Sequence, residues 1–144
     1  MHPFPHRYHV TATASNDTDV QLTAPGVATI KSAAPVEFGG PGDLWSPESL
    51  LVASVADCFV LSFRAIARGS RLEWADLACS VEGILDRVDG VSRFTEFAVS
   101  ATLTVGPEVD TAKAERLLHK AEKACLVTNS LIAATHLQAT VLIT

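Results

Sequence analysis

The sequence is poor in cysteine and lacks the patterns in which cysteine usually builds disulfide scaffolds or zinc sites. Three cysteines occur in 144 residues, an odd and sparse number, whereas small secreted scaffolds carry dense, even sets. No C-x-x-C pair is present, which excludes the thioredoxin-type motif and the usual zinc knuckle. Any disulfide in this chain is therefore expected to belong to a reaction cycle rather than to a structural staple.

Basic patches and long uninterrupted apolar runs are also missing. The 11 lysines and arginines are scattered and the net charge is −5, so no electrostatic footprint for nucleic acid is present. The apolar runs are interrupted well short of the roughly 20 residues that span a bilayer, so no membrane partner is expected. No charged segment followed by an apolar segment and a cleavage site opens the chain. We therefore expect a cytoplasmic protein.

The histidines and serines form no recognisable metal or hydrolase motif. The five histidines lack ligand spacing, being clustered near the start or isolated, at His2, His6, His9, His119 and His136. The G-x-S-x-G signature of serine hydrolases is absent as well. We therefore expect neither a metal nor a bound cofactor.

Length and patterning predict a single α+β domain over residues 1–144. Hydrophobic residues make up 48% of the chain and charged residues 19%, which is typical of a globular domain of this size. Alternating polar and apolar residues predict strands, with a reversal at Asp89-Gly90, over 7–14, 20–23, 27–30, 77–85, 94–105 and 137–143. Helical spacing predicts a second helix from Asp110 and a short helical turn over 129–135. This element order favours antiparallel sheets.

The most distinctive element is a long apolar helix that begins after residue 46. Ser46 is suited to cap it, Pro47 to its first position and Glu48 to its first turn, and it is expected to end near Gly69. Polar residues are so few between positions 50 and 63 that the helix must be buried on most sides. One small sheet cannot cover it, so we expect an obligate homodimer with the long helices buried between the sheets.

Two cysteines lie within apolar helical patterns and allow two interpretations. Cys58 and Cys125 are either core residues, as free cysteines often are, or a nucleophile and its resolving partner. Burial without a nearby donor or cation would raise the pKa of a thiol and make it inert. Cys79 lies on the apolar face of a predicted strand and is interpreted as structural. Glu48 stabilises the helix dipole or serves a site, and the residues alone leave both open.

A resemblance to a known family rests on two segments. The first comprises Ser46-Pro47-Glu48-Ser49-Leu50-Leu51 and Ala56-Asp57-Cys58-Phe59. It is similar to the Asn-Pro-Glu-x-Leu…Ala-Ala-Cys-Phe segment of the OsmC/Ohr family of organic hydroperoxide reductases. The second is Lys120-Ala121-Glu122-Lys123-Ala124-Cys125-Leu126-Val127-Thr128-Asn129. It resembles that family's Cys-Pro-Val-Ser-like stretch.

This resemblance implies a thiol peroxidase with active sites at the interface of an intertwined homodimer. Cys58 would attack an organic hydroperoxide and become a sulfenic acid, and Cys125 would resolve it as a Cys58–Cys125 disulfide. An external dithiol, in this family typically a lipoylated protein, would reduce that disulfide. Glu48 would position an arginine whose guanidinium favours the thiolate.

The arginine that the resemblance implies has one upstream candidate. Arg7 is the only arginine before Cys58, Lys31 is a weaker substitute, and the loop before the long helix reads Pro35-Val36-Glu37-Phe38-Gly39-Gly40. Asp57 and Leu126 are smaller departures from the family pattern. Two alternatives to the enzyme stay open: a non-enzymatic protein that binds a small apolar ligand, and a thiol redox sensor.

Overall fold

The long apolar segment forms one uninterrupted helix, α1 (Pro47–Gly69). At its start the backbone N–H of Ser49 donates to Ser46 Oγ at 3.1 Å, and the N–H of Ser46 donates to Ser49 Oγ at 2.9 Å. This reciprocal pair satisfies two N–H groups that a helix start leaves free. Pro47 occupies the first helical position, where a missing N–H does no harm. The predicted boundaries of this helix are confirmed.

Judged by length and composition alone, α1 is apolar enough to cross a membrane, with a mean hydropathy of 1.9 over 18 residues. Asp57 and Arg64 interrupt the apolar run of α1, as the sequence indicates, and the absence of a membrane partner stays a prediction. A helix in the core of a globular domain passes the same measure. Only 22% of this 18-residue stretch of α1 is buried by this chain.

The computed structural model describes residues 1–144 and divides them into two compact units, Met1–Leu50 and Leu51–Thr144. The boundary falls inside α1, which runs through it without a break. The single domain over 1–144 therefore stays a prediction.

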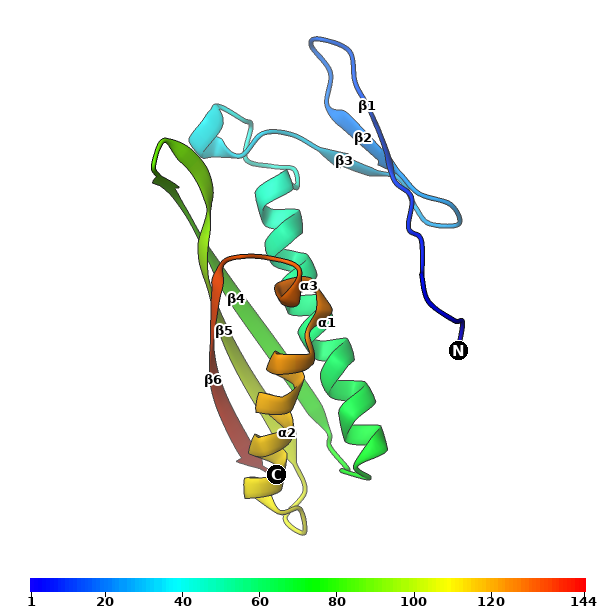
Figure 1. Ribbon diagram of the computed structural model, residues 1–144, viewed down its shortest axis with the longest axis vertical. Helices are drawn as coiled ribbons and strands as arrows, with labels where there is room; N and C mark the ends of the chain where they lie inside the picture. The colour runs from blue at the N-terminus through cyan, green and yellow to red at the C-terminus, as the bar shows by residue number, and fades with distance from the viewer. The chain divides into compact units, whose positions relative to one another are not determined.

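The first unit contains a small antiparallel meander of β1 (Thr11–Thr13), β2 (Val20–Thr23) and β3 (Ile30–Ser32) (Figure 1). A short 3₁₀ turn, η1 (Val36–Phe38), follows. The range of β2 is confirmed, whereas β1 is shorter than predicted because only three of its residues pair with β2. The strand predicted over 27–30 begins at residue 30, because Gly26 takes a positive φ of 79° in the turn before it. Alternation of Tyr8 and Val10 with polar residues is typical of a half-buried strand face, but both side chains are exposed in this chain.

The second unit contains a three-stranded sheet of β4 (Asp76–Val88), β5 (Val91–Val105) and β6 (Ala134–Ile143), in that order. β4 and β5 are antiparallel and turn at Asp89 (φ 52°) and Gly90 (φ 77°), as the sequence predicts for a two-residue hairpin. β6 pairs with β5 in parallel, so this one pairing departs from the predicted antiparallel sheets, while the α+β class is confirmed. The chain between β5 and β6 crosses over through α2 (Thr111–Ala124), which brings β6 back to the end of the sheet where β5 begins.

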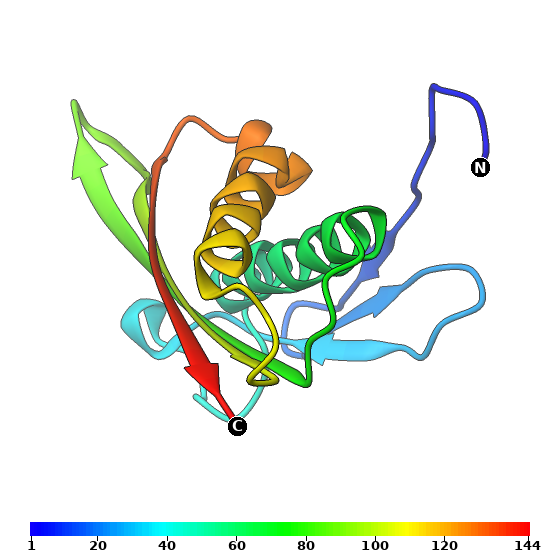
Figure 2. The same ribbon diagram turned by 90° about the horizontal axis from the view of Figure 1, so that it is seen from below.

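Both long helices cover the same face of this sheet (Figure 2). Asp110 caps α2 as predicted, accepting hydrogen bonds from the N–H groups of Ala112 and Lys113. Alternate residues of β5 are buried, as their spacing predicts: Phe97, Val99, Ala101, Leu103 and Val105. They meet one row of α1 (Val55, Phe59, Phe63 and Ala67) and one face of α2 (Ala114, Leu117, Leu118 and Ala121). These contacts form the core.

A glycine on β4 lets α1 approach the sheet closely. A Cβ built on Gly83 would lie 2.7 Å from Val52 Cγ2 on α1 and 2.9 Å from the ring of Phe94 on β5. Such separations are too short for carbon atoms, so any side chain here would push the helix or the ring away.

We therefore expect Gly83→Ala to lower the free energy of unfolding by about 1–3 kcal/mol through overpacking. Urea denaturation followed by circular dichroism measures this. Gly69→Ala at the end of α1 is the matched control, because its Cβ would meet nothing within 4 Å and its φ is not positive. It should change the stability by less than about 0.5 kcal/mol. Equal stability of the two variants would contradict the close approach.

Candidate active site

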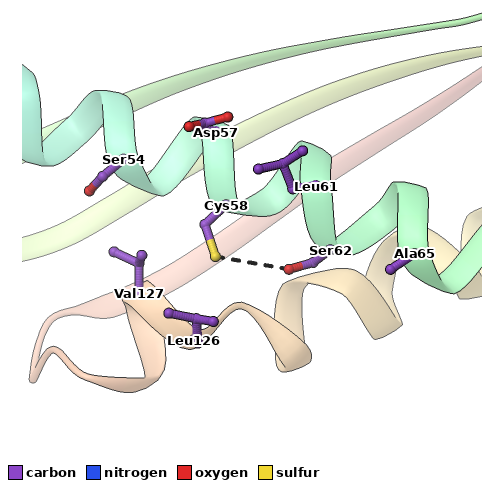
Figure 3. A pocket seen from close by; sticks show the side chains of 8 residues that line it. All are labelled: Ser54, Asp57, Cys58, Leu61, Ser62, Ala65, Leu126 and Val127. Carbon is purple, nitrogen blue, oxygen red and sulfur yellow. Dashed lines mark hydrogen bonds between the residues drawn. The ribbon is translucent and has the colours of Figure 1, made fainter. Parts of the chain in front are cut away.

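Cys58 lies on the face of α1 next to the buried row, and its side chain opens into a hollow. The hollow has a volume of about 430 Å³ and is lined by Ser54, Asp57, Cys58, Leu61, Ser62 and Ala65 of α1, together with Leu126 and Val127. Figure 3 shows the Cys58 and Ser62 side chains pointing toward Leu126 and Val127. The thiol is half-buried. A space of this size holds a small organic molecule beside the sulfur.

Cys125 lies at the junction of α2 and the short helix α3 (Leu126–Asn129), where it ends the first and caps the second. The side chain is buried, with 2% of its surface exposed, and it does not line the hollow. Thr128 and Asn129, polar residues next to it at the helix end, predict a more polar setting, and this prediction is wrong. The Thr128 hydroxyl and the Asn129 N–H both donate to the Cys125 carbonyl, at 3.1 and 3.0 Å, and so stabilise the turn. The helical turn predicted over 129–135 is wrong, because α3 ends at Asn129 and the strand that follows begins at Ala134.

The surroundings of Cys58 lower the pKa of its thiol. Burial acts first and raises its pKa, because a charged sulfur loses hydration. Hydrogen bonds to the sulfur outweigh burial and lower the pKa below its ordinary value. In order of size they come from the Val127 backbone, the Cys125 side chain, the Ser62 side chain and the Leu126 backbone. The donor that a reactive Cys58 requires is thus supplied by the segment that follows Cys125.

Two serines line the hollow, and only one of them reaches the sulfur. Ser62, four residues after Cys58 and one helical turn away, places its Oγ 3.9 Å from the Cys58 Sγ (Figure 3). Ser54 instead donates to the carbonyl of Leu51 at 2.7 Å. Sequence reasoning missed Ser62, although its i, i+4 spacing from Cys58 places it on the same helix face.

Cys79 on β4 differs from Cys58 in its ionisation. Burial, with a smaller contribution from the nearby Cys125, raises the pKa of its thiol to about 11. A thiol that stays protonated at neutral pH is a poor nucleophile. The interpretation of Cys79 as structural agrees with this environment.

The remaining predicted site residues belong to the other unit, Met1–Leu50. Glu48 lies in the first turn of α1, where one carboxylate oxygen, Oε2, is buried without a hydrogen-bond partner. Arg7 and Lys31 are exposed, and neither forms an ion pair in this chain. The structure therefore brings Cys58 and Cys125 together, while the roles of Glu48 and Arg7 stay predictions.

We expect Ser62→Ala to raise the pKa of Cys58, because the variant removes a donor to the thiolate. Below the midpoint of the titration, alkylation by iodoacetamide should slow by about three- to tenfold. The pH profile of alkylation, followed by mass spectrometry of the Cys58 peptide, measures both effects. Ser54→Ala is the matched control and should leave the profile unchanged. Identical profiles for wild type and Ser62→Ala would contradict this role of Ser62.

The sequence and the fold both match known proteins. Residues 40–140 match the family described as OsmC-like protein. The chain is 26% identical over 137 residues to the uncharacterized protein YmaD of Bacillus subtilis, covering 92% of this chain and 91% of the relative.

Solved structures share the fold. An OsmC-like protein of unknown function from Vibrio cholerae superimposes with a TM-score of 0.83 at 17% identity, covering 94% of this chain and 99% of the other. The organic hydroperoxide resistance protein OsmC from Legionella pneumophila gives a TM-score of 0.75 at 23% identity, with 97% and 99% covered. An organic hydroperoxide resistance protein from Elizabethkingia anophelis gives 0.75 at 20% identity, with 98% and 100% covered. The chain belongs to the OsmC-like protein family.

Proposed function

We propose that this protein is a thiol peroxidase that reduces organic hydroperoxides. The observation that carries the proposal is the environment of Cys58: a half-buried thiol that opens into a hollow, with a pKa lowered by its surroundings, the Cys125 side chain among them. Leu61, Leu126 and Val127 supply apolar surface for an alkyl or aryl group. Related structures named as organic hydroperoxide resistance proteins support the same reaction class.

The first step oxidises Cys58. The thiolate sulfur attacks the terminal oxygen of the hydroperoxide, an S–O bond forms and the O–O bond breaks. The sulfur becomes a sulfenic acid, and the alkoxide that leaves takes up a proton to become an alcohol. The donors around the sulfur keep the thiolate available for this attack.

The second step resolves the sulfenic acid. The Cys125 sulfur attacks the Cys58 sulfur, the S–O bond breaks, and water leaves as the Cys58–Cys125 disulfide forms. Because Cys125 is buried outside the hollow, peroxide meets Cys58 first, which fits this division of roles. An external dithiol, for which a lipoylated protein is our proposal, then reduces the disulfide by two exchanges and becomes a disulfide itself. Such a cycle suits a reducing compartment, and we place the protein in the cytoplasm.

The proposal includes a homodimer and a guanidinium at the site. α1 leaves most of its apolar window uncovered in one chain, and a second copy is the simplest cover. A buried carboxylate oxygen without a donor is costly, and Glu48 Oε2 is such an atom. A guanidinium satisfies a carboxylate through two parallel hydrogen bonds, so we propose that Arg7 pairs with Glu48 and supports the Cys58 thiolate.

Stopped-flow mixing of the reduced protein with cumene hydroperoxide tests the reaction. We expect Cys58 to react about a hundredfold or more faster than free glutathione, because the site stabilises the charges that develop. Cys125→Ser should react at a similar rate but stop at the sulfenic acid, which dimedone traps for mass spectrometry. Cys79→Ser is the matched control and should still form the Cys58–Cys125 disulfide.

The outcomes of this experiment distinguish the peroxidase from the ligand-binding protein and the redox sensor. A Cys58 that reacts no faster than glutathione would rule out the peroxidase and leave the ligand-binding alternative. Fast oxidation of Cys58 without turnover in the presence of dithiol would favour the redox sensor. An unchanged disulfide yield in Cys125→Ser would remove Cys125 from the cycle.

Arg7→Ala should lower the rate of peroxide reduction by about ten- to a hundredfold, because a charge that stabilises the thiolate and the leaving oxygen is lost. Arg7→Lys should recover part of the rate, since lysine keeps the charge without the two-pronged geometry. Arg87→Ala, which removes an exposed arginine of β4, is the control. A wild-type rate in Arg7→Ala would show that the activating cation is another residue.

A further inference from the structure

The hollow beside Cys58 contains a single charged side chain. Of the eight residues that line it, Asp57 alone is charged; two are serines, one is Cys58 and the rest are apolar. α3 contributes only Leu126 and Val127, so no cation faces Asp57 across the hollow. The Asp57 side chain is exposed and forms no ion pair with any lysine, arginine or histidine of the chain. No ion pair within this chain neutralises its negative charge.

The position of Asp57 on the helix places this charge at the rim. Figure 3 shows Cys58 and Ser62 on the side of α1 that faces Leu126 and Val127, with Asp57 and Leu61 along the neighbouring side. Asp57 directly precedes Cys58 in the chain, so its carboxylate lies within about one Debye length, roughly 8–10 Å, of the sulfur. Because Asp57 lines the hollow, its carboxylate acts on the charge of what enters it.

An approaching peroxide meets this charge in addition to that of the thiolate. The Arg7 guanidinium proposed above offsets the charge of the thiolate, so the Asp57 carboxylate is the charge that repels a hydroperoxide carrying a carboxylate of its own. A neutral alkyl or aryl hydroperoxide meets no such repulsion and contacts Leu61 and Leu126, whose exposed fractions are 49% and 69%. The two kinds of peroxide are otherwise alike at the reacting O–O bond.

We propose that Asp57 is a specificity-determining residue that makes the site select neutral organic hydroperoxides over anionic ones. This inference rests on the proposed peroxidase function and names its substrate class. Asp57 takes no part in bond making or breaking. It changes the rate at which each substrate reaches Cys58.

Three matched substrates test the selection: cumene hydroperoxide, its para-carboxylate, and the methyl ester of that carboxylate, which controls for size. The second-order rate constants of Cys58 oxidation are measured by stopped flow at low and high salt. We expect wild type to prefer the ester to the carboxylate by about tenfold at low salt and by less at high salt, as screening weakens the repulsion. Asp57→Asn should reduce the ratio by about three- to tenfold, and Asp57→Lys should reverse the preference.

The ratio of rate constants, rather than either rate, is the readout. Any side effect of the substitution on the Cys58 thiolate changes both rate constants equally and cancels. Asp76→Asn, at the exposed first residue of β4, is the control and should keep the wild-type ratio. If Asp57→Asn keeps that ratio while cumene hydroperoxide is still reduced quickly, the selectivity proposal is wrong and the peroxidase stands. If no variant reduces any of the substrates, the peroxidase proposal itself fails.

Discussion

The rotation of α1 about its own axis is fixed by one row of buried side chains, and the site depends on that rotation. Val55, Phe59, Phe63 and Ala67 recur every four residues and pack against β5. Two of them are phenylalanines, whose large buried surfaces make any other rotation expensive. Because successive helical residues are turned by about 100°, fixing Phe59 also fixes where Cys58 points. The packing of the core therefore also determines the orientation of the Cys58 thiol.

The same arrangement explains how a half-buried sulfur can be reactive. A thiol within an apolar helix is normally disfavoured as an anion, since the charge loses its water. Here the chain returns from α2 and places the backbone of Leu126 and Val127 within hydrogen-bonding reach of the sulfur. Backbone donors carry no net charge and cannot be titrated away. The local environment thus favours the thiolate before any arginine is considered.

Much of the fold could be predicted because local signals and packing agree. The cap at Ser46, the Asp89-Gly90 turn and the buried face of β5 follow from short-range chemistry, and the structure confirms each. The parallel pairing of β6 could not be predicted, since it depends on how α2 crosses the sheet rather than on residues within the strand. In the first unit, the exposed face of β1 reflects a strand whose apolar side this chain does not cover.

Only part of the site could be predicted from the sequence. The contexts of Cys58 and Cys125 point to a pair through resemblance, whereas the donors come from backbone N–H groups, which every residue except proline carries. Sequence therefore cannot single out Leu126 and Val127 as donors. The burial of Cys125 was also missed, because polar neighbours at a helix end suggest exposure, while here they bond to the backbone.

Cys79 is a poorly nucleophilic thiol close to the proposed Cys58–Cys125 pair. With a pKa of about 11, only about one molecule in ten thousand carries the Cys79 thiolate at pH 7, and only the thiolate attacks a disulfide. Although Cys79 lies close enough to Cys125 for its pKa to be affected, its protonated thiol does not attack a Cys58–Cys125 disulfide. The odd number of cysteines therefore need not produce mixed pairings, and oxidising equivalents stay on the two residues that an external dithiol would reduce.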